Sequence, residues 1–273
     1  MSDFEDGPQA SWGEGPSAQI KGYRAGNLLG SNGSFGPPEA VTLEDGRDGH
    51  AWLREALPFP DREAFRYGCV RSAVCAAWHE SATGAWCGNV NFSKGQLYVD
   101  NQMGETGLVI LGPERSCGVF SSGDPYRPYD AEAAAKTAPS WARPHLEALT
   151  AELATHYQTT PTAIFWTEGD HIAGAEPFHV LYAYGFETLG ETLLDDAAWR
   201  AFSEEEYEGE LSPTVAGDII DIAQRYARTG EPVRLTNEVM QRLFPPDAPG
   251  REDALRSLTD AENFIAMLAP ETR

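Results

Sequence analysis

Apolar residues follow different patterns in successive regions of the chain. In residues 1–48 they are sparse and without a period, while glycine and proline are frequent. This composition is typical of loops, or of an extended arm that is ordered only where it lies on a folded body. Trp12, Tyr23 and Phe35 are residues that could anchor such an arm. We therefore expect a glycine- and proline-rich N-terminal arm over residues 1–48.

Between residues 49 and 190 the pattern predicts short strands. Residues 65–78 are apolar on both alternating sets, which favours a central strand covered on both faces, with Val70, Val74 and Cys75 in the core. Residues 178–186 alternate and place one apolar set on a single face, as in a half-buried strand. The other expected strands cover residues 86–92, 96–100, 107–111, 117–120 and 162–167. The total is about seven strands.

Helical patterns interrupt these strands once and dominate after Gly190. The alanine-rich residues 130–136, and a stripe formed by Trp141, Leu146, Leu149 and Leu153, predict a helical insert. Further along, residues 197–202 begin a helix, and Ser203 with Glu206 has the capping-box spacing that would start the next one.

The remaining helices have signals at their ends. Ser212 followed by Pro213 predicts a helix start, and Gly230 predicts the end of the same helix. Residues 236–244 and 253–268 predict two more helices.

The order of these elements indicates the fold class. Strands with one inserted helix, followed by a run of helices, are typical of α+β proteins, whereas a doubly wound parallel sheet alternates strand and helix. We expect a mixed or antiparallel sheet of about seven strands with an inserted helix and a C-terminal helical cluster. The expected division is an α+β core over residues 49–190 and a helical region over residues 191–273 packed on it.

Charge bears on partners rather than on fold. The 273 residues include 42 acidic and 20 basic side chains, a formal net charge of −22. Binding to nucleic acid or to an anionic membrane relies on Lys and Arg, so neither partner is expected. The N-terminus lacks the pattern of a signal peptide, and no apolar run approaches about 20 residues, so we expect a soluble, cytoplasmic protein. The acidity indicates a solvated surface, a face that binds a basic protein, or mimicry of a nucleic acid.

Neither a metal nor a nucleotide cofactor is expected. Cys69, Cys75, His79 and Cys87 lack the tight cysteine pair of structural zinc sites, which favours buried free thiols. In an extended strand Cys75 and His79 would lie about 13 Å apart, too far for a thiolate–imidazole pair. The glycines between residues 26 and 36 lack the Gly-Lys-Ser/Thr ending of a phosphate-binding loop.

The segment 167–179 is the first candidate for chemistry. Glu168, Glu176, His171 and His179 cluster there between two predicted strands. If those strands pair, Glu168 and His179 approach each other across the ladder, and a carboxylate beside a histidine suits proton transfer near neutral pH. The alternative is a polar hairpin tip without catalytic function.

The acidic tract 191–210 is the second candidate. It contains eight acidic residues against one arginine, interleaved with aromatic residues, a mixture found at protein interfaces. The expected partner-binding residues are Trp199, Glu204, Glu205, Tyr207 and Glu208. Our leading hypothesis is an acidic protein-binding module, such as an immunity- or antitoxin-type inhibitor of a basic protein. The alternative is a small-molecule enzyme that uses the histidines and carboxylates of segment 167–179.

Overall fold

The computed structural model describes most of the chain beyond residue 60. The described residues are 61–85, 90–93, 96–100, 104–112, 114–122, 129–185, 189, 192–207, 209–259 and 267–269. The expected arm at 1–48 and the start of the predicted strand 86–92 lie outside them.

One antiparallel sheet forms the middle of the molecule, with its six strands hydrogen-bonded in chain order. They are β1 (Val90–Ser93), β2 (Gln96–Asp100), β3 (Thr106–Leu111), β4 (Ser116–Ser121), β5 (Ala163–Glu168) and β6 (His171–Gly174). The α+β class is therefore confirmed, and so are the strands predicted at 96–100, 107–111, 117–120 and 162–167. The prediction of about seven strands in one sheet is wrong, because two predicted strands are helices and β6 was not foreseen.

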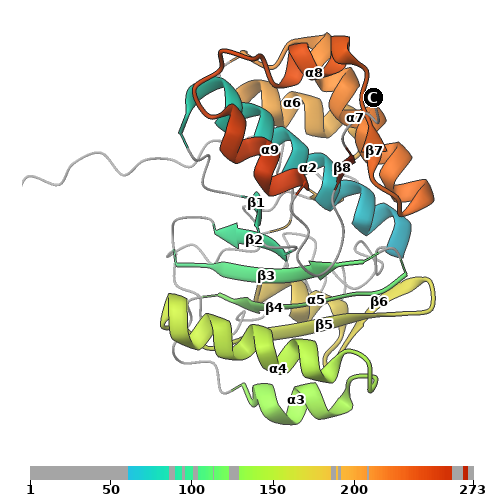
Figure 1. Ribbon diagram of the computed structural model, residues 1–273. Coiled ribbons are helices and arrows are strands. Elements are labelled where there is room, and N and C mark those ends of the chain that lie inside the picture. Colours follow the sequence, from blue (N-terminus) through green and yellow to red (C-terminus); the bar gives the residue numbers. More distant parts are fainter. Residues whose placement is uncertain are drawn as a thin grey trace, which may run out of the picture.

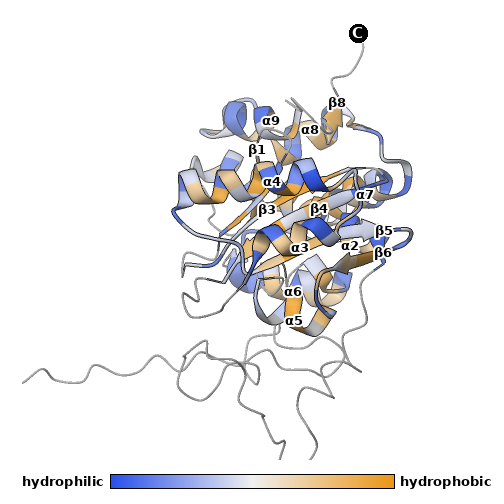
Figure 2. Cartoon of the chain, turned by 90° about the horizontal axis from the view of Figure 1, so that it is seen from below, coloured by the Kyte–Doolittle hydropathy of each residue, from blue (hydrophilic) through white to orange (hydrophobic). Residues whose placement is uncertain are grey.

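Both faces of the sheet are buried, and successive residues of a strand alternate between two cores. In β3, Leu108 and Ile110 belong to one core, whereas Val109 and Leu111 belong to the other. The core with Leu108 is covered by α3 (Ala131–Thr137) and α4 (Arg143–Glu152), the predicted insert between β4 and β5. Apolar positions gather on the strands and on the helix sides that face them (Figure 2).

The opposite face is covered by α2 (Arg62–Thr83), where the sequence predicted a central strand. Asp61 caps the start of α2 by accepting a hydrogen bond from the Ala64 amide, and Gly84 ends it in the left-handed conformation. Val70, Val74 and Cys75 are buried as expected, but in a helix. The prediction failed because a helix enclosed on nearly all sides has no polar stripe, so its sequence matches that of a doubly covered strand.

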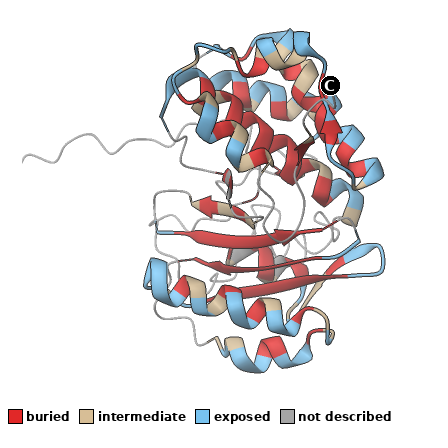
Figure 3. Cartoon of the chain, in the orientation of Figure 1, coloured by how far each residue is buried: buried red, intermediate tan, exposed pale blue. Residues whose placement is uncertain are grey.

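α2 crosses the sheet and joins it to the C-terminal helices. Its first turn meets the β5–β6 turn, where the Arg62 amide donates to the Asp170 carbonyl at 2.8 Å, and its later residues contact β1. On its outer side it contacts α7 (Pro213–Thr229) and α9 (Arg251–Thr259). Figure 1 shows α2 with these helices on one side of the sheet and α3 with α4 on the other. Figure 3 shows that α2 is buried along its middle and less so at its ends.

The second predicted strand that is a helix lies at residues 178–186. After β6 the chain passes Pro177 and forms α5 (Phe178–Ala183). Strand β5 pairs instead with β6 through a tight turn in which Gly169 has a φ of 61°. The second strand of the hairpin therefore begins at residue 171, seven residues earlier than the alternation suggested. A half-buried helix and a half-buried strand can share several apolar positions, which is why residues 178–186 resembled a strand.

The C-terminal helices follow the predicted signals in part. Ser212 and Gly230 cap α7 as expected, and Thr236 caps α8 (Asn237–Leu243). The predicted new start at Ser203 is wrong, because α6 (Asp196–Glu206) runs through it and Ser203 is buried. Two short parallel strands, β7 (Val233–Arg234) and β8 (Leu268–Ala269), pair beyond α7. The helix predicted over residues 253–268 therefore does not reach its expected end, because Leu268 belongs to β8. None of the described helices combines the length and apolarity needed to cross a membrane.

Candidate functional site

The start of α6 is fixed to α2 by a buried arginine. Arg71 is fully buried, and its guanidinium donates to the Asp196 carboxylate and to the Leu194 carbonyl, both at 2.8 Å. The Tyr67 hydroxyl donates to the same carboxylate oxygen. Burial, and then this hydrogen bond, raise the pKa of Tyr67 to about 12. A buried charge is tolerated only when it is paired in this way, so the cluster joins the first turn of α6 to α2.

Trp199 belongs to this internal cluster and not to a surface. Its side chain is fully buried, and the Arg71 guanidinium lies 4.9 Å from its ring centroid. Trp199 is therefore not the partly exposed aromatic residue expected in the acidic tract, so among the two expected aromatic residues only Tyr207 can play that part. The reason is a cation–π contact with an arginine 128 positions earlier in the chain, which no local pattern reveals.

The end of α6 presents the other aromatic residue of the acidic tract. Tyr207 is half-buried, with its ring centroid 4.9 Å from that of His79 and 5.9 Å from that of Trp78, the latter edge-on at 86°. The described acidic residues close to Tyr207 in the sequence have exposed side chains. They are Glu204, Glu205, Glu206 and Glu210. Glu208 lies outside the described residues.

Acidic groups from neighbouring helices extend this region. Glu80 follows His79 on α2, and its pKa is raised by burial and then by the nearby carboxylate of Asp253 on α9. We call the surface formed by His79, Glu80, Glu204, Glu205 and Tyr207, with the buried Trp78 beneath the Tyr207 ring, the α2–α6 face. The sequence predicted the α6 half from its acidic tract, whereas only the packing of α6 on α2 brings the α2 residues beside it.

The residues of segment 167–179 do not converge in the predicted way. Glu168 and His171 are direct partners across the β5–β6 ladder, and both are exposed. Glu176 is half-buried in the following turn, and His179 lies on α5 with its side chain outside the described atoms. The predicted approach of Glu168 to His179 is wrong because β5 pairs with β6 and not with residues 178–186.

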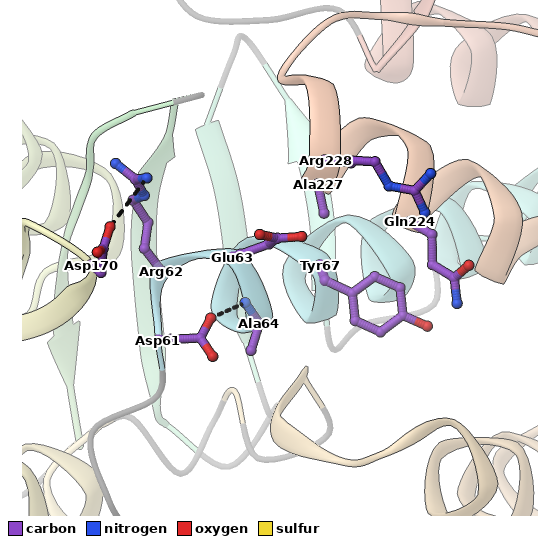
Figure 4. A pocket seen from close by; sticks show the side chains of 9 residues that line it. All are labelled: Asp61, Arg62, Glu63, Ala64, Tyr67, Asp170, Gln224, Ala227 and Arg228. Atoms are coloured by element: carbon purple, nitrogen blue, oxygen red, sulfur yellow. Dashed lines mark hydrogen bonds and ion pairs between the residues drawn. The ribbon is translucent and has the colours of Figure 1, made fainter.

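An open groove of about 630 Å³ lies beside this hairpin (Figure 4). It is lined by the first turns of α2, by Asp170 of the β5–β6 turn and by the C-terminal half of α7. Arg62 forms an ion pair with Asp170 at 3.5 Å and donates to the Glu114 carbonyl. Gln224 and Arg228 are exposed along its α7 side. No sequence pattern indicated this groove, because its walls come from three segments that are more than 50 residues apart along the chain.

The thiols are placed in the cores. Cys69, Cys75 and Cys117 are buried and form no disulfide, while Cys87 lies outside the described residues. Because α2 is a helix, Cys75 and His79 lie one turn apart and not at the spacing of a strand, but Cys75 remains a core residue. Within the described residues no three potential ligand side chains gather as a metal site would require.

Comparison with known proteins gives no relative: no family model, no curated protein and no solved structure matches this chain.

Proposed function

We propose that this protein binds a basic protein through the α2–α6 face, as an immunity- or antitoxin-type inhibitor would. The observation that carries the proposal is the position of Tyr207. Its half-buried ring is held against His79 and Trp78, and the exposed carboxylates of Glu204 and Glu205 precede it by three and two residues at the end of α6. Partly buried aromatic residues encircled by charge are typical of the anchor positions of protein interfaces.

The two components of the face have different expected roles. A tyrosine already packed on neighbouring rings loses little conformational freedom when a partner covers it, so it suits a contact that holds the complex together. The carboxylates around it, together with the net charge of −22, attract a basic partner and accelerate its association. The first effect slows dissociation, whereas the second depends on ionic strength.

The first testable prediction separates these roles. The association and dissociation rates of a partner captured on the purified protein are measured by surface plasmon resonance. They are compared between the wild type, the double variant Glu204→Lys/Glu205→Lys and the variant Tyr207→Ala. We expect the double charge reversal to lower the association rate by about tenfold at low salt and to weaken its salt dependence. Tyr207→Ala should raise the dissociation rate by about tenfold or more, since aromatic anchors typically contribute above 1 kcal/mol.

The matched control is Glu147→Lys/Glu231→Lys, which changes the net charge equally on α4 and on the turn after α7, where both residues are exposed. This control should change the association rate less than the reversal on the face. If both charge reversals act equally, or if Tyr207→Ala leaves the dissociation rate unchanged, the α2–α6 face is not the interface.

The alternative, a small-molecule enzyme using segment 167–179, has less support. Its exposed pair, Glu168 and His171, does not line the groove, although the neighbouring Asp170 does. Loss of a measured activity in His171→Ala, with partner binding unchanged, would favour this alternative.

A further inference from the structure

A stacked pair of tyrosines lies on the other side of the sheet from the α2–α6 face. Tyr157 and Tyr98 have ring centroids 5.0 Å apart and planes inclined by 19°. Tyr98 projects from β2 toward the core covered by α3 and α4, and Tyr157 ends the helical segment that follows α4. Tyr157 is 37% exposed and is the one large hydrophobic side chain classed as exposed among the described residues.

The backbone around Tyr157 holds this ring in place. Helix α4 continues into a π-helical turn, η3 (Leu153–Tyr157), and Gln158 then adopts a left-handed conformation with a φ of 54°. The next residue, Thr159, is tied to β4 by a 2.5 Å hydrogen bond between its hydroxyl and that of Ser121. A non-glycine residue in this conformation costs free energy, so the neighbouring contacts must stabilise it.

Carboxylates lie beside the tyrosine pair. The Tyr98 hydroxyl donates to the Asp100 carboxylate at 2.7 Å. Burial raises the pKa of Tyr157, and the nearby negative charges of Glu152 and Asp100 raise it further. His156 is the neighbouring titratable group on the same turn, with its ring centroid 6.5 Å from that of Tyr157. One face of the Tyr157 ring is against Tyr98, so its exposed area belongs to the remainder of the ring.

From this geometry we infer that Tyr157, with Asp100 and Glu152, forms a docking site for an arginine side chain of a partner protein. A guanidinium stacks on an aromatic face and is attracted by its negative quadrupole. Carboxylates at the rim supply the opposite charge and accept its hydrogen bonds. The negative charge of the whole molecule favours the same ligand over an anionic one. The site does not depend on the proposed function of the α2–α6 face, since other elements form it.

The probe for this site is N-acetyl-arginine amide, with N-acetyl-citrulline amide as its neutral isostere. Binding is followed by NMR from the ring signals of tyrosine-labelled protein, with Tyr98 and Tyr157 assigned through Tyr→Phe variants. We expect saturable shifts at these two tyrosines with the arginine ligand and at least about fivefold weaker binding of citrulline, the factor that corresponds to 1 kcal/mol.

Variants locate the interaction. Tyr157→Leu should weaken arginine binding by about fivefold, measured from the NMR shift of the Tyr98 ring signal. Glu152→Gln should weaken it by about two- to fivefold. Glu147→Gln, which changes an exposed carboxylate of the same helix, should leave it unchanged. Glu204→Lys/Glu205→Lys should also leave the Tyr98 and Tyr157 shifts unchanged, which distinguishes this site from the α2–α6 face.

Several results would overturn the inference. Equal shifts with arginine and citrulline would indicate stacking without charge recognition. Equal weakening by Glu152→Gln and Glu147→Gln would indicate a general effect of net charge. Absence of saturable shifts at Tyr98 and Tyr157 up to the solubility of the ligand would mean that no arginine site exists there.

Discussion

Arg71 is the residue on which the packing of α6 most depends. It is fully buried, lies between the rings of Tyr67 and Trp199, and shares the Asp196 carboxylate with Tyr67. An ion pair of this kind is not by itself a source of great stability, because removing both charges from water is costly. Breaking it from one side is different, since the remaining charge stays in the core without its counter-ion.

Asp196→Ala is therefore expected to lower the free energy of unfolding by about 2 kcal/mol. The value is at the low end for a broken buried pair because the Asp196 side chain is 40% exposed. Asp221→Ala is the matched control: its carboxylate pairs with Arg225 on the surface of α7, where both side chains are about half exposed or more. We expect a change within about 0.5 kcal/mol for the control, measured by urea denaturation. Equal effects of the two substitutions would contradict a buried role for the Arg71–Asp196 pair.

At the scale of elements, α2 organises the molecule. It lies between the sheet and the C-terminal helices, and it contributes residues to the groove, to the Arg71 cluster and to the α2–α6 face. Close packing of this helix requires a glycine at one point. A Cβ at Gly68 would lie 1.7 Å from the Thr192 carbonyl oxygen, so the backbone before α6 can approach α2 only where no side chain intervenes.

Two glycines in helix interiors give a matched prediction at this scale. Replacing glycine by alanine in an unobstructed helix normally stabilises a protein by about 0.5–1 kcal/mol, because alanine has less freedom in the unfolded chain. We expect this result for Gly217→Ala in α7, where nothing lies within 4 Å of the added Cβ. Gly68→Ala should instead destabilise by about 1–3 kcal/mol, because the Thr192 backbone must move.

Thermal unfolding of the two glycine variants followed by circular dichroism provides the measurement. If both variants are stabilised, then α2 does not pack against the segment before α6 as described.

At the scale of the whole molecule, protonated groups in the interior link stability to alkaline pH. Burial raises the pKa of Cys117 to about 12. It also raises the pKa values of Tyr67, Tyr98 and Tyr226 above the ordinary value of tyrosine. In each case the folded protein holds a proton that the unfolded chain releases at lower pH. Their contributions to stability are therefore complete at neutral pH and decrease as the pH rises.

We expect the free energy of unfolding to fall from about pH 9, where the thiol of Cys117 ionises in the unfolded chain, and more steeply from about pH 10 as tyrosines ionise there. Cys117 alone should contribute a slope of about 1.4 kcal/mol per pH unit until its folded pKa of about 12 is reached. Urea denaturation between pH 7 and 11 measures this slope, and Cys117→Ala should reduce the slope that begins near pH 9 by about 1.4 kcal/mol per pH unit. Parallel pH profiles for the wild type and this variant would show that Cys117 is not the group involved.

Features that depend on nearby residues could be predicted from the sequence. The strands β3 and β4, the serine and proline that start α7, and the glycine that ends it are all found where they were expected. In each case the interactions that determine the element lie within a few residues along the chain. A cap hydrogen bond or a turn needs no distant partner, so its signal can be recognised locally.

Only the tertiary structure decided the elements that are covered from several sides. Residues 65–78 carry apolar side chains on every side, which suits a central strand and an enclosed helix equally, and packing between the sheet, α7 and α9 decided in favour of helix. The same holds for the candidate site. Trp199 is internal because Arg71 lies over its ring, and Tyr207 belongs to a face because His79 and Trp78 pack against it. These contacts join positions more than 120 residues apart, so the energy that selects them exists only once the chain has folded.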